Sequence, residues 1–166
     1  MPGRFHVRNF ALFVAGVGCG VLLMQPGAAQ TKGGTKLNHV SIAVKDFDAA
    51  VSYYTKTMGF RPAFTFREPD GKPILTYLQI SRETFLEIQP ATPDRPAGFF
   101  HLGLETDDVK GFAARVRANG TKIGEPTLSE RSGALLTMST DPEGIRTEIL
   151  ELGPASTQRK AINAWK

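Results

Sequence analysis

The sequence predicts an α+β fold made of two copies of a β-α-β-β-β module. Three observations lead to this fold class. Two histidines, His39 and His101, each open an apolar run. Two glutamates in apolar runs, Glu87 and Glu148, are separated by almost the same offset as the two histidines. A helical pattern with matching start and stop signals follows each histidine run, so these offsets indicate an internal repeat.

The helical pattern of each copy lies between an aspartate and a glycine, with the same spacing in both copies. Asp46 and Gly59 enclose the first pattern, and Asp107 and Gly120 enclose the second. An aspartate side chain accepts hydrogen bonds from the free N–H groups of a first helical turn, and glycine tolerates the left-handed conformation that ends a helix. Apolar residues at helical spacing lie between these signals, so each pair predicts one amphipathic helix.

A strand headed by the histidine precedes each predicted helix, and three further strands follow it. Turn sequences rich in Pro, Asp, Ser and Gly separate these strands. The three strands are expected at 61–67, 73–80 and 84–89 in the first copy, and at 122–128, 134–140 and 146–152 in the second.

These elements define one predicted domain at 37–152. We expect its parts at 37–90 for module 1, 91–98 for a stiff proline-containing linker, and 99–152 for module 2. The tail at 153–166 has apolar residues compatible with a short helix of open role.

Strand alternation predicts where the histidines point. Each histidine shares its face of the strand with a small residue two positions on, Ser41 after His39 and Gly103 after His101. Apolar residues occupy the opposite faces, and both glutamates alternate with apolar neighbours in the same way. Small residues beside a histidine leave the space that a cavity lining needs and a packed core does not.

Taken singly, a strand histidine is more often structural than a ligand, and a strand glutamate usually faces solvent. The repeat changes this interpretation, because both pairs occupy equivalent positions in the two copies. We therefore predict a metal site with the four ligands His39, Glu87, His101 and Glu148. The alternative is that gene duplication alone preserved the matching residues.

The N-terminal segment at 1–29 resembles an export signal. Arg4 and Arg8 precede an uncharged apolar run at 10–24, and small residues at 27–29 offer a cleavage site after Ala29. This run is shorter than the stretch of ~20 apolar residues that spans a bilayer, although an uncleaved anchor is the alternative. We therefore expect a periplasmic or secreted protein that contacts a membrane only through an uncleaved signal, with a flexible N-terminal segment at 30–36.

Composition narrows the chemistry of the predicted mature chain. The segment at 1–29 holds two of the 20 basic residues and none of the 16 acidic ones, which leaves a net charge of +2. No Lys/Arg cluster with interleaved aromatic residues is present, so we expect no nucleic-acid partner. The single cysteine, Cys19, lies in the leader, so the mature chain has neither disulfides nor thiolate ligands.

Three motifs in this sequence resemble signatures of the vicinal oxygen chelate superfamily. They are LNHVSIAVKD at 37–46, YY at 53–54 followed by MGF at 58–60, and DPEG at 141–144 ahead of Glu148. This superfamily includes glyoxalase I, methylmalonyl-CoA epimerase, extradiol dioxygenases, and fosfomycin and bleomycin resistance proteins. The resemblance covers 37–152 and implies that the two modules form a curved mixed sheet around a metal-binding cavity.

The resemblance also implies a ligand set and a reaction class. The glyoxalase I pattern takes one ligand from the first, fourth, fifth and eighth strands, where the four predicted ligands fall. It implies a divalent ion (Zn, Ni, Mn or Fe) and proton transfer next to a carbonyl through a metal-bound enediolate, as in a lyase or isomerase. On this pattern Glu148 is the principal base, and Glu87 is a ligand and a second acid or base.

Two other functions are compatible with the same resemblance. Extradiol dioxygenases use two histidines and one carboxylate on Fe(II), equivalent here to His39, His101 and Glu148. A non-catalytic metal or small-molecule binding protein of the resistance type is the third. Glu87 favours proton transfer over oxygen chemistry, because it completes the His/Glu/His/Glu set of bacterial glyoxalase I enzymes. Epimerases of the family usually have an amide at this position, and members that only sequester drugs commonly lack the ligands. Export argues against glyoxalase I itself, since glutathione is abundant in the cytosol.

The expected partners are a small-molecule substrate with adjacent oxygens and a second copy of the chain. Half of the predicted ligands lie on each module, so the modules can close within one chain or exchange across a two-fold dimer. Because glyoxalase-like relatives often form their sites between chains, we expect a homodimer with shared sites.

Overall fold

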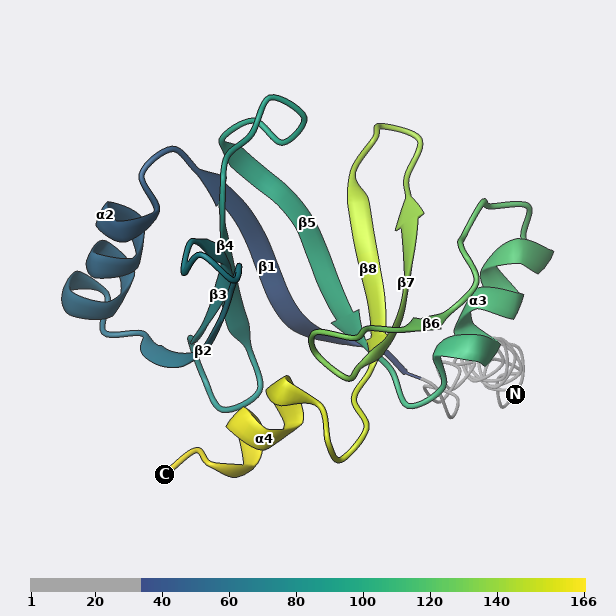
Figure 1. The fold of residues 1–166 in the computed structure, drawn as a ribbon. Coiled ribbons are helices and arrows are strands. Elements are labelled where there is room, and N and C mark those ends of the chain that lie inside the picture. The colour runs from purple at the N-terminus through teal and green to yellow at the C-terminus, as the bar shows by residue number, and fades with distance from the viewer. Residues whose placement is uncertain (1–33) are drawn as a thin grey trace, which may run out of the picture. The chain divides into compact units, whose positions relative to one another are not determined.

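The computed structural model describes residues 34–166, so the predicted signal peptide at 1–29 lies outside the described residues. The expected flexible segment at 30–36 falls mostly outside them too, and its last residue, Lys36, begins the first strand. Eight strands form one mixed sheet in the order β2-β3-β4-β1-β5-β8-β7-β6 (Figure 1). Among the helices of residues 34–166, none is long and apolar enough to cross a membrane.

The first module follows the predicted β-α-β-β-β order. Its elements are β1 (Lys36–Val44), α2 (Phe47–Ser52), η1 (Tyr53–Thr57), β2 (Arg61–Arg67), β3 (Pro73–Gln79) and β4 (Phe85–Pro90). The second module repeats this order with β5 (Gly98–Glu105), α3 (Val109–Ala118), β6 (Thr127–Leu128), β7 (Leu135–Thr140) and β8 (Arg146–Glu151). The tail adds α4 (Thr157–Asn163). The predicted α+β fold class with two repeated modules is confirmed.

The helix signals are correct in the first module and shifted by one residue in the second. The Asp46 carboxylate accepts a hydrogen bond from the Ala49 N–H at 2.9 Å and caps α2, which continues as the π-helical turn η1. At α3 the capping residue is Asp108, whose carboxylate accepts from the Gly111 N–H at 2.8 Å. The prediction of Asp107 was wrong, because a cap bonds the N–H two or three positions on and Val109 is the first helical residue.

The strand before β7 is much shorter than predicted. Only Thr127 and Leu128 form a continuous ladder with β7, whereas a strand was expected over 122–128. Pro126 has no N–H to give to a ladder, and Gly124 weakens strand structure. Before the proline, the chain is held by an isolated bridge between Ile123 and Ser139 and by the Thr137 hydroxyl, which donates to the Gly124 carbonyl at 2.7 Å.

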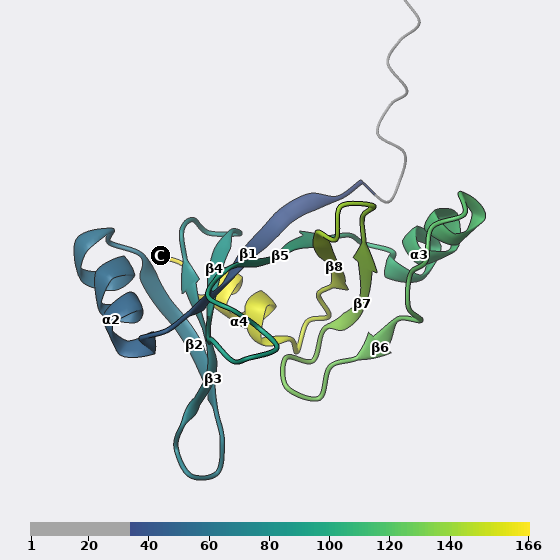
Figure 2. The ribbon, with the colours of Figure 1, turned by 90° about the horizontal axis from the view of Figure 1, so that it is seen from above.

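Two parallel pairs and one antiparallel pair form the centre of the sheet. Strand β1 pairs with β4 in parallel, β5 pairs with β8 in parallel, and β1 and β5 run antiparallel to each other. The four strands that carry the predicted ligands are therefore adjacent, in the order β4-β1-β5-β8. The sheet curls without closing, with α2 outside it and α4 near the inner side of the curve (Figure 2).

The core is divided between the two faces of this sheet. Under α2, Leu78, Leu86 and Ile88 are buried against apolar residues of the helix and of β1. On the inner face, Tyr77 and Phe85 form a second cluster with Ile162 of α4 and other buried residues. The tail helix therefore packs on the core instead of extending from it. Because successive strand residues point to opposite faces, Glu87 lies on the inner face, between Leu86 and Ile88.

Candidate metal centre

The register of the four central strands places the predicted ligands in two neighbouring rows of the sheet. The rows, read across β4, β1, β5 and β8, are Glu87–Ser41–His101 and His39–Gly103–Glu148. Because positions 39 and 41 are two residues apart on one strand, the side chains of both rows lie on the same face. Strand pairing therefore brings two imidazoles and two carboxylates together.

The donor atoms of the four predicted ligands are close together. His39 Nε2 lies 2.9 Å from His101 Nε2, 3.7 Å from Glu87 Oε2 and 3.9 Å from Glu148 Oε1. Donor atoms of His39, Glu87 and His101 all lie within 4.8 Å of one another. The structure thus groups three of the predicted ligands, His39, Glu87 and His101, while Glu148 lies outside this group and approaches His39 alone.

These distances are compatible with one bound divalent ion. Bonds from zinc to nitrogen and oxygen ligands are about 2.0–2.2 Å, so two donors on one ion lie at most ~4.4 Å apart. The three distances from His39 Nε2 are all shorter than this limit. Glu148 nevertheless lies outside the group of three donors that are all within 4.8 Å of one another, so its side chain would have to shift to complete the set. Two imidazole nitrogens and two carboxylates form a donor set that suits Zn, Ni, Mn or Fe. The residues present therefore fit the expected group.

A chain of buried hydrogen bonds fixes the proton position on His39. The Glu105 carboxylate can only accept, and it accepts from Asn38 Nδ2 at 3.1 Å. Asn38 Oδ1 therefore faces His39 Nδ1, at 3.0 Å, and accepts its N–H. The neutral His39 ring then has its lone pair on Nε2, the atom that faces the other donors. Arg159 of α4 donates to the other carboxylate oxygen of Glu105, Oε1, at 2.8 Å, which holds this carboxylate in place.

Gly103 makes room for the His39 ring. A Cβ atom at position 103 would lie 2.0 Å from His39 Cε1 and 2.1 Å from Nδ1, far inside contact distance. The glycine is needed for this close approach, since its backbone has no left-handed conformation to explain its presence. Any side chain at position 103 would displace the His39 imidazole ring.

Three side chains anchor Glu87. Its Oε1 accepts from the Ser41 hydroxyl at 2.8 Å and from the Gln89 amide, and its Oε2 accepts from the Tyr77 hydroxyl. Tyr77 is buried, and both burial and the nearby Glu87 charge raise its pKa well above the usual value. Tyr77 therefore stays protonated and remains a donor. These bonds hold the Glu87 carboxylate in a fixed orientation.

The ligands of the second module lack comparable anchors. His101 Nδ1 is buried and has no hydrogen-bond partner among the described residues. Leaving a buried polar atom unpaired costs roughly 1–3 kcal/mol, so its retention requires a reason other than stability. Glu148 has no side-chain hydrogen bond within residues 34–166, and 14% of its side chain is exposed against 4% for Glu87.

Burial sets the charge states of the cluster. It lowers the pKa of His39 to about 3. Burial also lowers the pKa of His101 to about 4. The Glu87 charge acts to raise this pKa, and repulsion from His39 and Arg146 acts to lower it further. Both rings are therefore neutral at pH 7, as metal ligands must be. Burial, then repulsion from Glu87, raises the pKa of Glu148 to about 7, against the opposing effect of Arg146.

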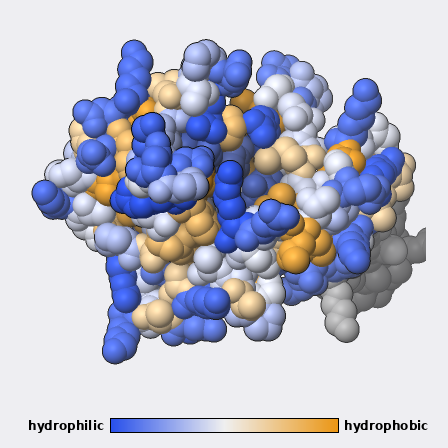
Figure 3. Space-filling model, viewed as in Figure 1, coloured by the Kyte–Doolittle hydropathy of each residue, from blue (hydrophilic) through white to orange (hydrophobic). Residues whose placement is uncertain are grey.

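The cluster opens into a cavity of about 220 Å³. Glu87, His101 and Glu148 are part of its lining, together with apolar side chains such as Phe100 and Met138. Hydrophilic atoms crowd the middle of the face seen in Figure 3, with hydrophobic patches on both sides. A polar end beside apolar walls is typical of a site for a small molecule.

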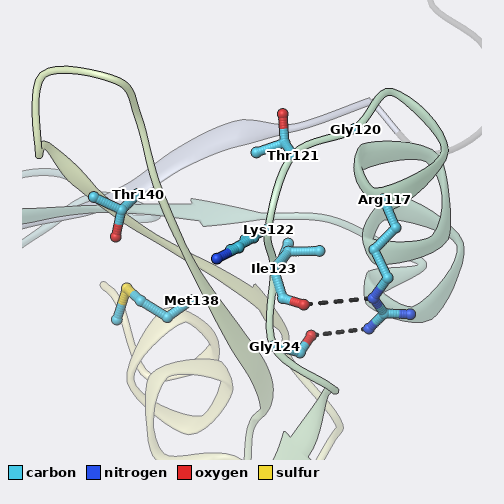
Figure 4. Close-up of a pocket in the computed structure, with 8 residues that line it drawn as sticks. All are labelled: Arg117, Gly120, Thr121, Lys122, Ile123, Gly124, Met138 and Thr140. Carbon is cyan, nitrogen blue, oxygen red and sulfur yellow. Dashed lines mark hydrogen bonds between the residues drawn. The ribbon is translucent and has the colours of Figure 1, made fainter.

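A larger, more open cavity of about 790 Å³ lies elsewhere, along the chain between α3 and β7 (Figure 4). Its cationic side chains are Arg117 and Lys122, and it contains no histidine or carboxylate. Arg117 donates to the backbone carbonyls of Ile123 and Gly124, at 3.4 Å and 3.0 Å. This arginine fixes the connection after α3, and the smaller cavity is the one that contains reactive groups.

Sequence reasoning missed the side chains that orient the ligands. Tyr77 pairs across from Glu87 in the β3–β4 ladder, and Gln89 lies two positions further along its own strand. Strand alternation alone would have placed both on the inner face beside Glu87. The contact of Arg159 with Glu105 depends on how α4 packs, and no local signal in the sequence reports it.

The expected sharing of sites between two chains remains a prediction. In the described chain both half-sites meet within one copy, through the β1–β5 pair. A site shared between copies would need the two modules to be exchanged between them.

Comparison with known proteins agrees with this architecture. Residues 36–149 match the Glyoxalase/Bleomycin resistance protein/Dioxygenase superfamily, and the chain belongs to this family. Similar curated proteins include a probable chloroplastic lactoylglutathione lyase from Arabidopsis thaliana, 28% identical over 127 residues. That match covers 72% of this chain but 36% of the relative, and another plant relative is covered to 44%. The chain thus spans less than half the length of these plant proteins.

Bacterial relatives are closer to this chain in length. A lactoylglutathione lyase from Salmonella typhimurium is 23% identical, with 70% of this chain and 92% of the relative covered. An ethylmalonyl-CoA/methylmalonyl-CoA epimerase from Cereibacter sphaeroides is 26% identical, with 61% and 85% covered. The relatives are thus enzymes of two reaction types, a lyase and an epimerase.

Solved structures agree on the fold. A methylmalonyl-CoA epimerase from Streptomyces coelicolor, in complex with 2-nitronate-propionyl-CoA, has a TM-score of 0.60 and 24% identity, with 73% of this chain and 96% of that one covered. A hypothetical protein from Bacillus halodurans has a TM-score of 0.61 and 21% identity, with 72% and 95% covered. At these identities, the likeness establishes the shared fold alone.

Proposed function

We propose that this protein is a metal-dependent lyase or isomerase that moves a proton on a carbon next to a carbonyl. The observation that carries the proposal is the convergence of two neutral imidazoles and two carboxylates on one cavity. The carboxylate pair is unequal, since Glu148 is free of hydrogen bonds among the described residues and Glu87 accepts three. The lactoylglutathione lyases and epimerases among the relatives support the same reaction class.

His39, Glu87, His101 and Glu148 would hold a divalent ion. When bound, such an ion binds adjacent substrate oxygens and stabilises negative charge that develops on them. The substrate class that suits this chemistry is a small molecule with two neighbouring oxygens.

Glu148 is the principal base in this proposal. In the metal-free chain, burial and then repulsion from Glu87 raise its pKa to about 7, so this carboxyl group can exchange a proton near neutral pH. With no hydrogen-bond partner among the described residues, its carboxylate is free to move toward the substrate. Glu87 serves as a ligand and a second acid or base, with its proton exchange limited by Ser41, Tyr77 and Gln89.

A direct test is deuterium exchange in D2O. The purified protein, loaded with Zn, Ni, Mn or Fe(II) in separate samples, is incubated with hemithioacetals of methylglyoxal and with small 2-hydroxy ketones. Incorporation of deuterium at the carbon next to the carbonyl, followed by ¹H NMR, supports the proposal. Absence of exchange with every metal and substrate, while the metal is bound, contradicts it.

A second candidate is an Fe(II) dioxygenase. The three donors available for it are His39, His101 and Glu148, and the bonds that Glu87 accepts from Ser41, Tyr77 and Gln89 would then hold Glu87 beside the site as a supporting group. Oxygen consumption by the Fe(II)-loaded protein with catechols would identify this activity. Metal retention with neither exchange nor oxygen consumption would identify a binding protein instead.

Two further properties belong to the proposal: export to the periplasm or medium, and a homodimer with shared sites. Fractionation of the producing cells, with processing after Ala29 checked by mass spectrometry, tests export. For the dimer, one variant lacking His39 and Glu87 is mixed with another lacking His101 and Glu148. Shared sites restore about half the activity per mixed dimer, because one of the two sites is then intact. No recovery in confirmed mixed dimers places each site within one chain.

A further inference from the structure

Two arginines line the same cavity as the metal centre. Arg146 is the first residue of β8 and is half-buried, and Arg131 lies in the turn that precedes β7. Both share the lining with His101 and Glu148. The fixed positive charges therefore lie at the side of the cavity formed by module 2.

Neither guanidinium has a partner among residues 34–166. No carboxylate of the described chain lies within 4.0 Å of Arg131 or Arg146, and neither side chain donates a hydrogen bond there. Arg95 donates to the Pro90 carbonyl and Arg159 donates to Glu105. Arg82 and Arg115 have no such partner in the described chain either, but both are exposed and lie outside the cavity, whereas Arg146 is half-buried in its wall. A guanidinium has five N–H donors that match the oxygens of a carboxylate or phosphate.

The Arg146 side chain is held by a neighbouring ring, and the backbone that carries the exposed Arg131 is held by a turn. The Arg146 guanidinium carbon lies 4.5 Å from the centre of the Phe100 ring, a cation–π contact that supports the plane of the group. Arg131 belongs to a turn closed by the Gly133 N–H, which donates to the Ser129 carbonyl at 2.8 Å. The Thr157 N–H then ties this turn to the start of α4 through the Ser132 carbonyl, at 2.9 Å.

The cavity wall offers neutral donors as well. The hydroxyl oxygens of Ser129 and Ser132 accept backbone N–H groups, at 3.1 Å and 3.3 Å, so their hydroxyl protons remain available to donate. Both serines line the cavity beside Arg131. Two unpaired guanidinium groups and two hydroxyl groups in one small space form a surface suited to an anion.

We propose that Arg131 and Arg146 form an anion subsite that binds a carboxylate or phosphate group of the substrate. This inference rests on the proposed function, which defines the reacting carbonyl end of the substrate. It adds that the other end of the substrate carries a negative charge. The cavity of about 220 Å³ is smaller than the ~300–1,000 Å³ of drug-sized sites. The substrate class is therefore a small anionic carbonyl compound.

Binding to the metal-free protein tests the subsite separately from catalysis. Malonate, inorganic phosphate and the neutral analogue malonamide are titrated while the arginine Nε–H resonances are followed by NMR. We expect malonate or phosphate, but not malonamide, to shift the Arg131 and Arg146 signals. Tighter binding of phosphate indicates a phosphate substrate, and tighter binding of malonate indicates a carboxylate.

Arginine variants give the matched comparison. Arg131→Gln and Arg146→Gln should each weaken anion binding about 10- to 100-fold, the range for losing a charge-assisted hydrogen-bonded pair. Arg115→Gln is the control, because the Arg115 guanidinium also lies over a phenylalanine ring, 5.5 Å from its centre, but on α3. Arg146→Lys keeps the charge and serves if the glutamine variant does not fold.

Several outcomes overturn the subsite: no selective shift by either anion, equal binding of malonamide, or an equal loss in Arg115→Gln. Deuterium exchange remains a separate readout. Anion binding without exchange refutes the lyase or isomerase and leaves the subsite, while exchange without anion binding refutes the subsite alone.

Discussion

The two modules share a strand order but hold their ligands in different ways. In module 1, Asn38 precedes the histidine and fixes its tautomer, whereas Phe100 occupies the equivalent position in module 2. Across from the glutamates, β3 supplies the Tyr77 hydroxyl and β7 supplies the Met138 thioether. Module 1 therefore forms a rigid polar frame, and module 2 leaves its ligands open to the cavity.

The helices of the two modules also differ in how they pack on the sheet. In module 1, residues of α2 cover Leu78, Leu86 and Ile88 on the outer face of the sheet. In module 2, α3 buries Val109 and Ala113, whereas α2 has no fully buried residue, and the cavity of about 790 Å³ lies beside the end of α3. The features that both modules preserve are the central strands and their ligands. We infer that the repeat is maintained where the two modules form one site, and has diverged outside it.

The largest expected effect separates the two glutamates. Glu148→Gln removes the free carboxylate of module 2 and should lower turnover by a factor of about 10²–10⁴ at saturating metal, the range for loss of a general acid–base group. Glu87→Gln removes the anchored carboxylate and should act mainly on metal affinity. Steady-state rates and metal titrations of both variants measure the difference. Equal losses of turnover at saturating metal would remove the distinction between the modules.

The next effect tests the close packing of the two modules. Gly103→Ala places a methyl group inside the His39 ring position and should lower the free energy of unfolding by roughly 1–3 kcal/mol. Ser41→Ala is the repeat-equivalent control, because position 41 already has a Cβ atom and loses only its hydrogen bonds to Glu87 and Gln89. Urea denaturation of the metal-free variants compares the two. A smaller loss for Gly103→Ala than for Ser41→Ala would contradict the steric account.

A third prediction concerns the tautomer of His39. Glu105→Gln allows the Asn38 amide to turn, because glutamine can donate as well as accept, so the lone pair on His39 Nε2 is no longer enforced. Loss of such a supporting group typically costs about 10- to 100-fold in metal affinity. Imidazole ¹⁵N shifts in the metal-free protein report the tautomer directly, with Glu125→Gln as the control at the exposed ion pair with Arg117. An unchanged His39 spectrum in Glu105→Gln would refute the relay.

The sequence indicated the repeat and the ligand face because both depend on local signals. Histidines and glutamates at matching offsets, and strand alternation around them, were sufficient to place the four donors on one face. The short length of β6 does not follow from the strand-like pattern at 122–128, because Pro126 interrupts the ladder inside that pattern. The relay from Arg159 could not be predicted, since it requires the packing of the C-terminal helix against a residue 54 positions away.

The smallest effect is a pH dependence of stability in the metal-free protein. His39 and His101 titrate near 6.5 when unfolded and at about 3 and 4 when folded, so the unfolded chain binds more protons below pH 6.5. Their contribution makes the folded state less stable as the pH falls from 6.5 toward 4. Glu148, with its pKa raised from 4.5 to about 7, retains a proton in the folded state and opposes this trend.

Near pH 5.5 the two histidines bind about two protons in the unfolded chain, and Glu148 binds about one in the folded chain. The unfolded chain therefore binds about one more proton, so the free energy of unfolding changes by roughly 1.4 kcal/mol per pH unit. Glu148→Gln removes the opposing group and should steepen this slope, whereas replacing both histidines with glutamine should reverse it. Urea midpoints between pH 5 and 7 measure all three slopes. A Glu148→Gln slope no steeper than that of the unchanged protein would contradict the raised pKa of Glu148.

Metal content is the most direct test of the central claim that the two half-sites form one centre. The protein is loaded with each divalent ion, freed of excess metal and analysed by elemental analysis, alongside alanine variants at His39, Glu87, His101 and Glu148. We predict one ion per chain, a melting temperature that a chelator lowers, and loss of that shift in each variant. A protein that retains no ion, and whose melting temperature a chelator leaves unchanged, would contradict the account.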